Sequence, residues 1–317
     1  MTQMTRVPNQ RLMLESVSCP ICAVDDCAVV YPSRRTAWEV NDGEFSPSGD
    51  APLVDPLVRC RCCGMQYVNP RVPIDVALQG YASAIDERFA SQLAGRELTF
   101  RRCLRKLQSM WGKPPGRLLD IGTANGSFLK VAKDAGWEVH GCEPNHWLRN
   151  WCKQRYGISV RPGTIFDAGF QGGSFDVITL WDVLEHTGDP SAVLRECERL
   201  LAPGGLLVIN YPDIGSWVAR LMGRRWVFLI SVHNYYFTRR TIKIILDRTG
   251  FQALAIRPHI QSLQLDYIFC RAESLFGALA RFARNIIRGM GWSHLQVRYW
   301  VGQTLVIACR KEGGGFD

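Results

Sequence analysis

Strand-like and helix-like patterns alternate between residues 117 and 212. Strands are predicted at residues 117–122, 138–142, 158–161, 174–182 and 206–212. Between them, apolar side chains recur every three or four positions, which predicts helices at 127–135, 146–156 and 190–201. This alternation predicts an α/β fold in which helices cover both faces of a largely parallel sheet.

The flanking segments complete this organisation. Helical periodicity runs from Tyr81 to Trp111 and stops at WGKPPG. We therefore expect an N-terminal module at residues 1–80, a helical connection at 81–112 and a main domain at 113–317. The closing GQTLVIACRK is the predicted last strand, antiparallel and paired beside FQALAIRP at residues 251–258.

A loop of small residues follows the first predicted strand. In RLLDIGTANGSF, the small residues Gly122, Ala124 and Gly126 stand at alternate positions before a helix start. Small residues let a ligand approach the backbone, and the free N–H groups of a helix N-terminus favour anionic or polar ligand atoms. The loop therefore predicts a nucleotide-like ligand. A purely structural turn is the alternative, because the G-x-G-x-x-G spacing is not met.

Ligands of parallel α/β sheets bind at the carboxyl ends of the strands. Four stretches lie there: Asp120 to Gly126, Glu143-Pro144, Gly163-Thr164-Ile165 and Trp181-Asp182-Val183. Glu143 ends the second strand about 20 residues beyond the small-residue loop, where an acidic side chain accepts two hydrogen bonds from a ribose diol. A solvated carboxylate is the alternative.

Two cysteine pairs lie in the N-terminal module. Cys19-Pro-Ile-Cys22 is matched by Cys60-Arg-Cys-Cys63, and two such turns direct four thiolates at one ion. We expect a structural zinc ion held by Cys19, Cys22, Cys60 and Cys63, with free thiols as the alternative. Cys27 and Cys62 lie close enough in sequence to complicate the assignment.

Composition bears on where the protein is expected to be in the cell and on the state of its cysteines. The 317 residues include 47% hydrophobic residues and no apolar run of about 18 residues, so no membrane span is predicted. The N-terminal residues lack the apolar core of a secretory signal, which favours the cytoplasm. The twelve cysteines are then expected to be thiols or metal ligands.

The net charge of +9 is concentrated near the C-terminus. Residues 217–317 contain 15 Lys and Arg against five Asp and Glu, whereas residues 1–216 contain 23 against 24. This asymmetry would attract an anionic substrate, a membrane surface or nucleic acid, and a solvated basic face is the alternative.

Four motifs, in order, carry a family resemblance: LLDIGTANGSFL, HGCEPN, GSFDVITLWDVLEHTGDP and LLAPGGLLVINYP. Together they resemble the class I S-adenosylmethionine-dependent methyltransferases over roughly residues 115–255. DVLEH and HNYYFTRRTIKIILDRTGF resemble the branch of quinone-biosynthesis O-methyltransferases. CPIC and RCRCCGMQYVNPR resemble the zinc knuckles that precede this domain in some members. The resemblance implies a Rossmann-like seven-stranded sheet, a small zinc-ribbon module and S-adenosylmethionine as the cofactor.

The resemblance also assigns roles by position. Asp120 and the loop are expected to hold the methionine part of the cofactor, and Glu143 the ribose hydroxyls. Thr164 stands where many members have an adenine-contacting aspartate, and Ile165 would contact the ring. The expected cofactor residues are Asp120, Gly122, Thr123, Ala124, Asn125, Gly126, Glu143, Pro144, Thr164, Ile165, Trp181, Asp182 and Val183.

Two histidines are candidates for a catalytic base. Methyl transfer to a hydroxyl is helped by a group that removes its proton, and histidine suits neutral pH. His186 follows the fourth strand, and His233 lies in the aromatic run SVHNYYF. For each, a structural role is the alternative: His186 would brace its loop and His233 would orient the lid.

Two further segments are expected to form lid insertions, at about residues 214–238 and 262–298. Trp217 to Phe237 is rich in aromatic residues and includes Arg220, Arg224 and Arg225. It would give an anionic or lipid-like acceptor an apolar wall with cationic groups, unless it is an ordinary helix with a solvated arginine face.

Residues 266–292 predict a basic amphipathic helix. Apolar side chains recur at Leu275, Leu279, Phe282, Ile286 and Met290, with Arg281, Arg284 and Arg288 on the other side. The helix would either pack on the core with its arginines in water or rest on an anionic membrane.

We expect methyl transfer to a hydroxyl oxygen of a small biosynthetic molecule, and no nucleic-acid partner. A sugar C-methyltransferase is one alternative, because zinc knuckles also precede such domains. A zinc-ribbon nucleic-acid-binding or scaffold protein with a degenerate methyltransferase domain is another; its basic residues are not interleaved with a recognisable nucleic-acid motif. The sequence does not set the oligomeric state.

Overall fold

The computed structural model describes residues 13–35, 45–47, 51–87 and 93–311 of the chain. Within these ranges no helix combines the length and the apolar character that crossing a membrane requires.

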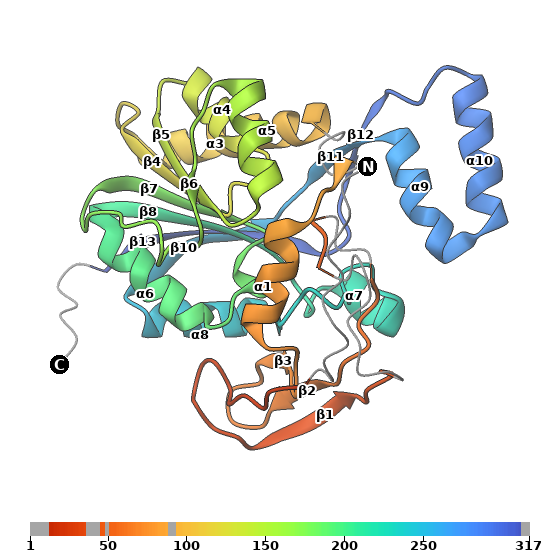
Figure 1. The fold of residues 1–317 in the computed structure, drawn as a ribbon, viewed down its shortest axis with the longest axis horizontal. Coiled ribbons are helices and arrows are strands. Elements are labelled where there is room, and N and C mark those ends of the chain that lie inside the picture. The colour runs from red at the N-terminus through yellow and green to blue at the C-terminus, as the bar shows by residue number, and fades with distance from the viewer. Residues whose placement is uncertain (1–12, 36–44, 48–50, 88–92, 312–317) are drawn as a thin grey trace.

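The centre of the molecule is a seven-stranded sheet (Figure 1). Its strands are β4 (Arg117–Ile121), β5 (Glu138–Glu143), β6 (Arg161–Pro162), β7 (Phe175–Trp181), β8 (Leu201–Pro212), β10 (Phe251–Pro258) and β13 (Gln303–Arg310), in the order β10-β13-β8-β7-β4-β5-β6. Neighbours from β8 to β6 are parallel, whereas β13 pairs antiparallel with both β8 and β10. The predicted α/β sheet and its antiparallel last strand are confirmed.

Alternating side chains of the strands bury both faces of this sheet. In β4, Leu118 joins one hydrophobic cluster and Leu119 the other, and Leu206 and Leu207 of β8 divide in the same way. The first cluster packs against α3 (Leu93–Trp111), α4 (Ser127–Asp134) and α5 (His146–Tyr156), and the second against α6 (Pro190–Leu200) and α8 (Arg239–Arg248). Figure 1 shows these two groups of helices on opposite sides of the sheet. This arrangement follows from the two-residue period of a strand.

Side-chain caps begin three of these helices just after loops. Asn145 accepts a hydrogen bond from the N–H of Leu148 at the start of α5, and Asp189 accepts two at the start of α6, with Pro190 in the first turn. Thr238 and Thr241 form a reciprocal capping box at the start of α8. These caps fix the positions at which the chain leaves the sheet edge.

Three strands of the N-terminal module and one later strand form a small four-stranded sheet. It consists of β1 (Cys27–Tyr31), β2 (Leu57–Cys60), β3 (Gln66–Val68) and β9 (Tyr235–Tyr236). β9 comes from the segment after β8, so residues 170 positions apart share one sheet through the pairing of Gln66 with Tyr236. Met65 and Tyr67 are fully buried in the same cluster as Leu119 of the large sheet. The module therefore shares its core with the large sheet.

The predicted helix from Tyr81 to Trp111 is wrong as one element. The chain forms α1 (Ile74–Ser83) and then α3, and Ala84 is extended between them. The amide of Asn145 donates to the carbonyls of Tyr81 and Ala84 at 2.6 and 2.9 Å, which satisfies the end of α1. Phe89 lies outside the described residues. Strand β6 is also shorter than predicted, and β8 begins at Leu201, before the Pro-Gly-Gly turn.

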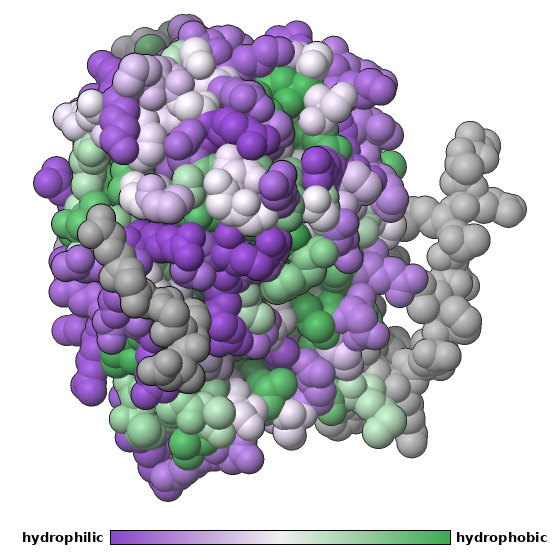
Figure 2. Space-filling view, turned by 90° about the vertical axis from the view of Figure 1, so that its left-hand side faces the viewer, coloured by the Kyte–Doolittle hydropathy of each residue, from purple (hydrophilic) through white to green (hydrophobic). Residues whose placement is uncertain are grey.

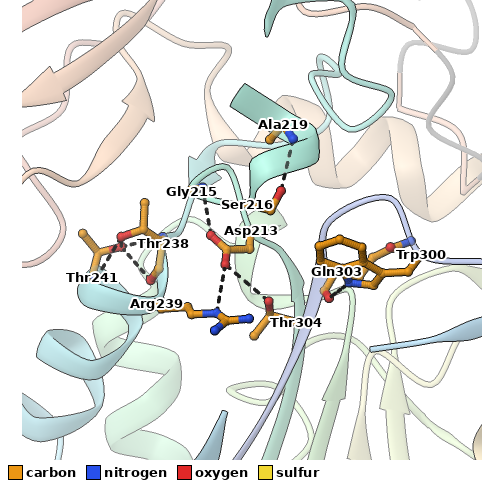
Figure 3. Close-up of polar contacts among 10 residues, drawn as sticks. All are labelled: Asp213, Gly215, Ser216, Ala219, Thr238, Arg239, Thr241, Trp300, Gln303 and Thr304. Carbon is orange, nitrogen blue, oxygen red and sulfur yellow. Dashed lines mark hydrogen bonds and ion pairs between the residues drawn. The ribbon is translucent and has the colours of Figure 1, made fainter. Parts of the chain in front are cut away.

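An insertion between β8 and α8 contains α7 (Trp217–Met222) and the short helix η2 (Gly223–Arg225). Asp213, directly after β8, anchors it (Figure 3): its carboxylate accepts hydrogen bonds from the N–H of Gly215 at 2.8 Å and the hydroxyl of Thr304 at 3.4 Å. Arg239 of α8 lies 3.6 Å from the same carboxylate. Both ends of the insertion are thus tied to one buried side chain.

A second insertion, between β10 and β13, projects from the body (Figure 1). It contains β11 (Gln261–Gln264) paired with β12 (Gln296–Tyr299), and the helices α9 (Leu265–Phe276) and α10 (Ala278–Gly289). The predicted continuous helix at 266–292 is wrong, because the chain breaks at Gly277, which has a φ of 51°. Packing on the core is also wrong for Leu279, Phe282 and Ile286, which are exposed.

Candidate active site

A cavity of about 750 Å³ lies at the carboxyl ends of β4, β5 and β7. Its wall includes every predicted cofactor residue except Gly126, and also His186 and His233. Other parts of the wall come from the N-terminal module, α1, α3, the insertion after β8, and α9. The four predicted stretches are therefore brought together around one space.

The small-residue loop after β4 is closely packed. Gly122 has a φ of 63°, and a Cβ on it would lie 2.7 Å from Val183. A Cβ on Gly126 would lie 2.2 Å from the sulfur of Cys152 in α5, so this glycine lets α4 and α5 approach. Ala124 also has a positive φ, 50°, which costs an alanine energy that glycine would not lose.

Glu143 holds this loop from β5. One carboxylate oxygen accepts from the N–H of Ala124 at 2.8 Å, and the other accepts from the N–H of Asn145 at 2.8 Å. Burial raises the pKa of Glu143, and these two backbone donors oppose the rise. The carboxylate is therefore fixed in orientation beside the cavity.

Asp120, in β4, is almost fully buried and accepts a hydrogen bond from the Thr179 hydroxyl at 2.6 Å. Burial raises the pKa of Asp120 to about 8. A cationic ligand group beside it would favour the ionised carboxylate.

The loop after β6 carries Thr164 and Ile165. The hydroxyl of Thr164 donates to Asp167 at 2.6 Å, and its N–H donates to the same carboxylate oxygen at 2.8 Å. Ile165 is buried, whereas the neighbouring Phe166 is exposed and borders the cavity. The Phe166 ring is a cavity residue that sequence reasoning missed.

Trp181 is the last residue of β7, and Asp182 follows it. Trp181 packs in an aromatic group with Phe100 and Phe128, at centroid distances of 5.1 and 4.9 Å. Burial raises the pKa of Asp182 to about 6, and the positive charge of Arg96 opposes the rise. Arg96, from α3, also borders the cavity and was missed, because its place follows only from how α3 packs.

Several buried polar atoms around the cavity have no partner within the described residues. They are Thr123 Oγ1, Asn125 Nδ2, Trp181 Nε1 and Asn210 Oδ1. Buried polar atoms are normally hydrogen-bonded, so such a group points to a polar ligand or water. Together with Asp120, Glu143 and the small-residue loop, these atoms fit a ligand such as S-adenosylmethionine, which has amino, carboxylate and ribose groups.

His186 and His233 lie together on the cavity wall, with ring centroids 4.7 Å apart. Nδ1 of His186 donates to the carbonyl of Val232 at 2.9 Å, and Nδ1 of His233 donates to the carbonyl of Phe228 at 2.9 Å. Because a carbonyl can only accept, Nε2 of each neutral ring is left able to accept a proton. Burial lowers the pKa of His186 to about 4 and that of His233 well below its usual value.

Glu185 completes a group that sequence reasoning missed. Both of its carboxylate oxygens are buried without a partner among the described residues. Burial raises its pKa well above the usual value, and the charge of Asp182 adds to the rise. Ligand atoms of Glu185, His186 and His233 lie within 4.8 Å of one another, so the three can share a proton or hold a cation.

The acceptor side of the cavity is mainly apolar. Phe45, Val72 and Leu78 contribute from the N-terminal region, and Val227 and Phe228 from the insertion after β8. The arginines predicted to face an acceptor, Arg220, Arg224 and Arg225, are not on this wall; Arg224 instead donates to the carbonyl of Pro32 and lies over the ring of Tyr31. That expectation is wrong for these side chains.

The four predicted cysteines form one cluster in the N-terminal module. The sulfurs of Cys19 and Cys63 are 3.4 Å apart, as are those of Cys22 and Cys60, and all four lie within 4.8 Å of one another. Four sulfurs at about 2.3 Å from one tetrahedral zinc ion would be about 3.8 Å apart. Among the described residues, Cys27 and Cys62 are not part of this group of four.

Comparison with known proteins identifies the family. The family model described as "Methyltransferase domain" matches residues 95–256. The ubiquinone biosynthesis O-methyltransferase of Psychrobacter cryohalolentis is 31% identical over 141 residues, 44% of each chain. That of Xanthomonas oryzae pv. oryzae is 51% identical over 100 residues, 30% of this chain and 42% of the relative. The chain thus spans less than half the length of these two curated relatives.

Among solved structures, a chain from the Haloferax volcanii complex of the Trm112 methyltransferase activator with a methyltransferase has the same fold. Its TM-score is 0.50 at 16% identity, covering 71% of this chain and 95% of that chain. The sheet order, the cavity and the matching family model lead to one conclusion: the chain belongs to the methyltransferase-domain family and has an S-adenosylmethionine-dependent methyltransferase domain.

Proposed function

We propose that the protein transfers a methyl group from S-adenosylmethionine to a hydroxyl oxygen of a small, largely apolar biosynthetic molecule. The observation that carries this proposal is one continuous cavity. It joins the positions expected to hold the cofactor to a pair of histidines with free Nε2 atoms. S-adenosylmethionine supplies a methyl group already activated as a sulfonium, so the protein has to align the acceptor and exclude water.

Three side chains would hold the cofactor. Glu143, oriented by two backbone N–H groups, would accept from the ribose hydroxyls. Asp120 would face the amino group, whose positive charge would favour the ionised carboxylate. Arg96 would bind the carboxylate of the methionine part, since a guanidinium matches carboxylate geometry. Thr164 and Phe166 would border the adenine ring of the cofactor.

His233 and His186 would act on the acceptor. Each ring is held by a hydrogen bond from Nδ1 to a backbone carbonyl, which leaves Nε2 to take the hydroxyl proton. Their low pKa values keep both rings neutral near pH 7, which a base requires. Glu185 would share the proton that a ring takes up, because its carboxyl group lies within reach of both rings.

The apolar wall supports an apolar acceptor over a sugar. Rings and alkyl groups bury well against Phe45, Val72, Leu78 and Phe228. A sugar would leave several hydroxyls without partners on that wall, which costs free energy. The zinc ion is proposed as structural, because four cysteine ligands leave no open position for chemistry.

Transfer of a labelled methyl group tests the proposal. The protein is incubated with isotopically labelled S-adenosylmethionine and a panel of phenols, other apolar alcohols and nucleotide sugars. We expect label on the oxygen of an apolar alcohol or phenol. His233→Gln should lower the rate by about 100-fold or more and leave cofactor affinity unchanged, since base catalysis contributes about that much. His294→Gln, outside the cavity wall, is the matched control.

Other outcomes would contradict the proposal. Label on the carbon of a nucleotide sugar would establish the sugar alternative. Equal rates in wild type and in the His186→Gln and His233→Gln variants would remove the two histidines as bases. Steeply salt-dependent binding to random oligonucleotides without methyl transfer would favour the non-enzymatic alternative.

A further inference from the structure

Seven of the seventeen exposed large apolar side chains of the described residues lie on one projecting segment, residues 279–297. Along α10, Leu279, Phe282 and Ile286 are exposed by 69%, 64% and 46%, and Met290 just beyond the helix by 50%. Their spacing of three and four residues puts them on one side of the helix. The apolar stripe of this amphipathic helix therefore faces away from the protein.

The packing of the hairpin fixes this orientation. Ala280 and Ile287, on a different side of α10, are buried, and Arg284 forms ion pairs with Asp266 and Glu273 of α9. Arg288 pairs with Asp266 as well, at 2.7 Å. These contacts tie α10 to α9 through its polar side, so the apolar stripe stays exposed.

The apolar surface continues past α10. Trp292, Leu295 and Val297 are exposed by 47%, 43% and 37% in the chain that returns through β12. Large apolar patches on a soluble surface mark interaction sites. Figure 2 shows the side of the molecule away from this hairpin, where hydrophilic residues predominate and hydrophobic ones occur in small groups.

The charge of the same segment is positive. Residues 265–300 contain five arginines and two acidic residues, Asp266 and Glu273. Both acidic residues are engaged by Arg284 or Arg288. Arg281 and Arg298 are exposed, with no acidic partner among the described residues. An apolar stripe on a basic segment matches an anionic bilayer, because acyl chains take the stripe and headgroups take the cations.

We propose that the hairpin formed by α9, α10 and residues 290–297 is a docking surface for an anionic lipid bilayer. Leu279, Phe282 and Ile286 would enter the interface between headgroups and acyl chains, and Trp292 would lie at headgroup level, where tryptophan is enriched. A second copy of the chain is a poorer occupant, since two hairpins of the same positive charge repel each other.

The surface adjoins the cavity. Tyr267, Ile268 and Ala272 of α9 are on the cavity wall, and α10 packs on the same helix. A docked hairpin would therefore bring the apolar acceptor side of the cavity close to the bilayer. The inference that an acceptor enters the cavity from the bilayer rests on the proposed function. The inference that the hairpin docks on a bilayer does not.

Sedimentation with vesicles tests the docking. The full chain is mixed with vesicles of phosphatidylcholine alone and with vesicles that also contain phosphatidylglycerol. We expect binding to the second kind, weakening with salt. Phe282→Asp/Ile286→Asp should lower this binding by about tenfold or more, since two buried apolar groups are lost. Leu221→Asp/Leu254→Asp changes two exposed apolar residues elsewhere and should bind as wild type does.

Two further measurements separate the alternatives. Arg281→Glu/Arg298→Glu should weaken binding to the anionic vesicles, while all variants should keep the wild-type affinity for S-adenosylmethionine, which shows that they are folded. Absence of binding to anionic vesicles, or equal binding by Phe282→Asp/Ile286→Asp, would overturn the proposal. The alternative outcome is a wild-type dimer that does not bind vesicles. If Phe282→Asp/Ile286→Asp turned that dimer into a monomer, the surface would be assigned to a second copy of the chain.

Discussion

Burial sets the protonation state of three histidines in the cavity. His186 has a pKa of about 4 and His259, which stacks near Trp181, one of about 3; that of His233 is well below its usual value. In each case burial disfavours the imidazolium, and hydrogen bonds to backbone carbonyls only partly compensate for His186 and His233. All three rings are therefore neutral at physiological pH.

This protonation can be measured through the histidine ring resonances. We expect the Cε1–H signals of His186, His233 and His259, assigned by single His→Gln variants, to stay constant between pH 5 and 8. Unfolded histidines bind protons below about pH 6.5, and these folded ones do not, so stability should fall as pH drops below about 6.5. A midpoint near 6.5 for any of the three signals would contradict their burial.

Residues placed by a single strand or loop could be predicted from the sequence, whereas residues placed by packing between distant elements could not. The strands and caps around Asp120 and Glu143 follow local patterns, so the small-residue loop and the place of Glu143 at the end of β5 were predictable. Arg96 and Glu185 were not, because their places depend on how α3 and the η1 turn (Leu184–His186) pack against distant elements. The sequence left open whether the apolar stripe of α10 meets the core or a membrane, because periodicity does not say which side of a helix meets protein.

Zinc binding by the four cysteines of the N-terminal module can be tested directly. We expect about one zinc ion per chain, and Cys60→Ser should lose it and lower the Tm. The module shares its core with the large sheet, so even a loss of about 4 kcal/mol would lower the Tm by about 10 °C. Cys62→Ser, two residues away and outside the cluster, is the matched control.

Metal analysis and thermal unfolding of both variants give the answer. Freshly purified wild-type protein without zinc, or equal metal content and Tm in Cys60→Ser and Cys62→Ser, would leave the four cysteines as free thiols.

In the molecule as a whole, one cavity is lined by four parts of the chain. The large sheet supplies the positions that we propose for the cofactor. The N-terminal module and the insertion after β8 supply the apolar wall, and α9 closes a further side. The pairing of β3 with β9 joins the N-terminal module and the insertion after β8 in one small sheet. No single segment could have revealed this, because each contributes only part of the wall.

We propose that S-adenosylmethionine binds in this cavity and that Glu143 is needed to hold it. Isothermal titration of the full chain with S-adenosylmethionine tests it most directly, with Glu143→Ala as the variant and Glu138→Ala, exposed on the same strand, as the control. Loss of two charge-assisted hydrogen bonds predicts affinity about 100-fold weaker in Glu143→Ala and unchanged in Glu138→Ala. No binding by the wild type, or equal affinity in Glu143→Ala, would contradict the account.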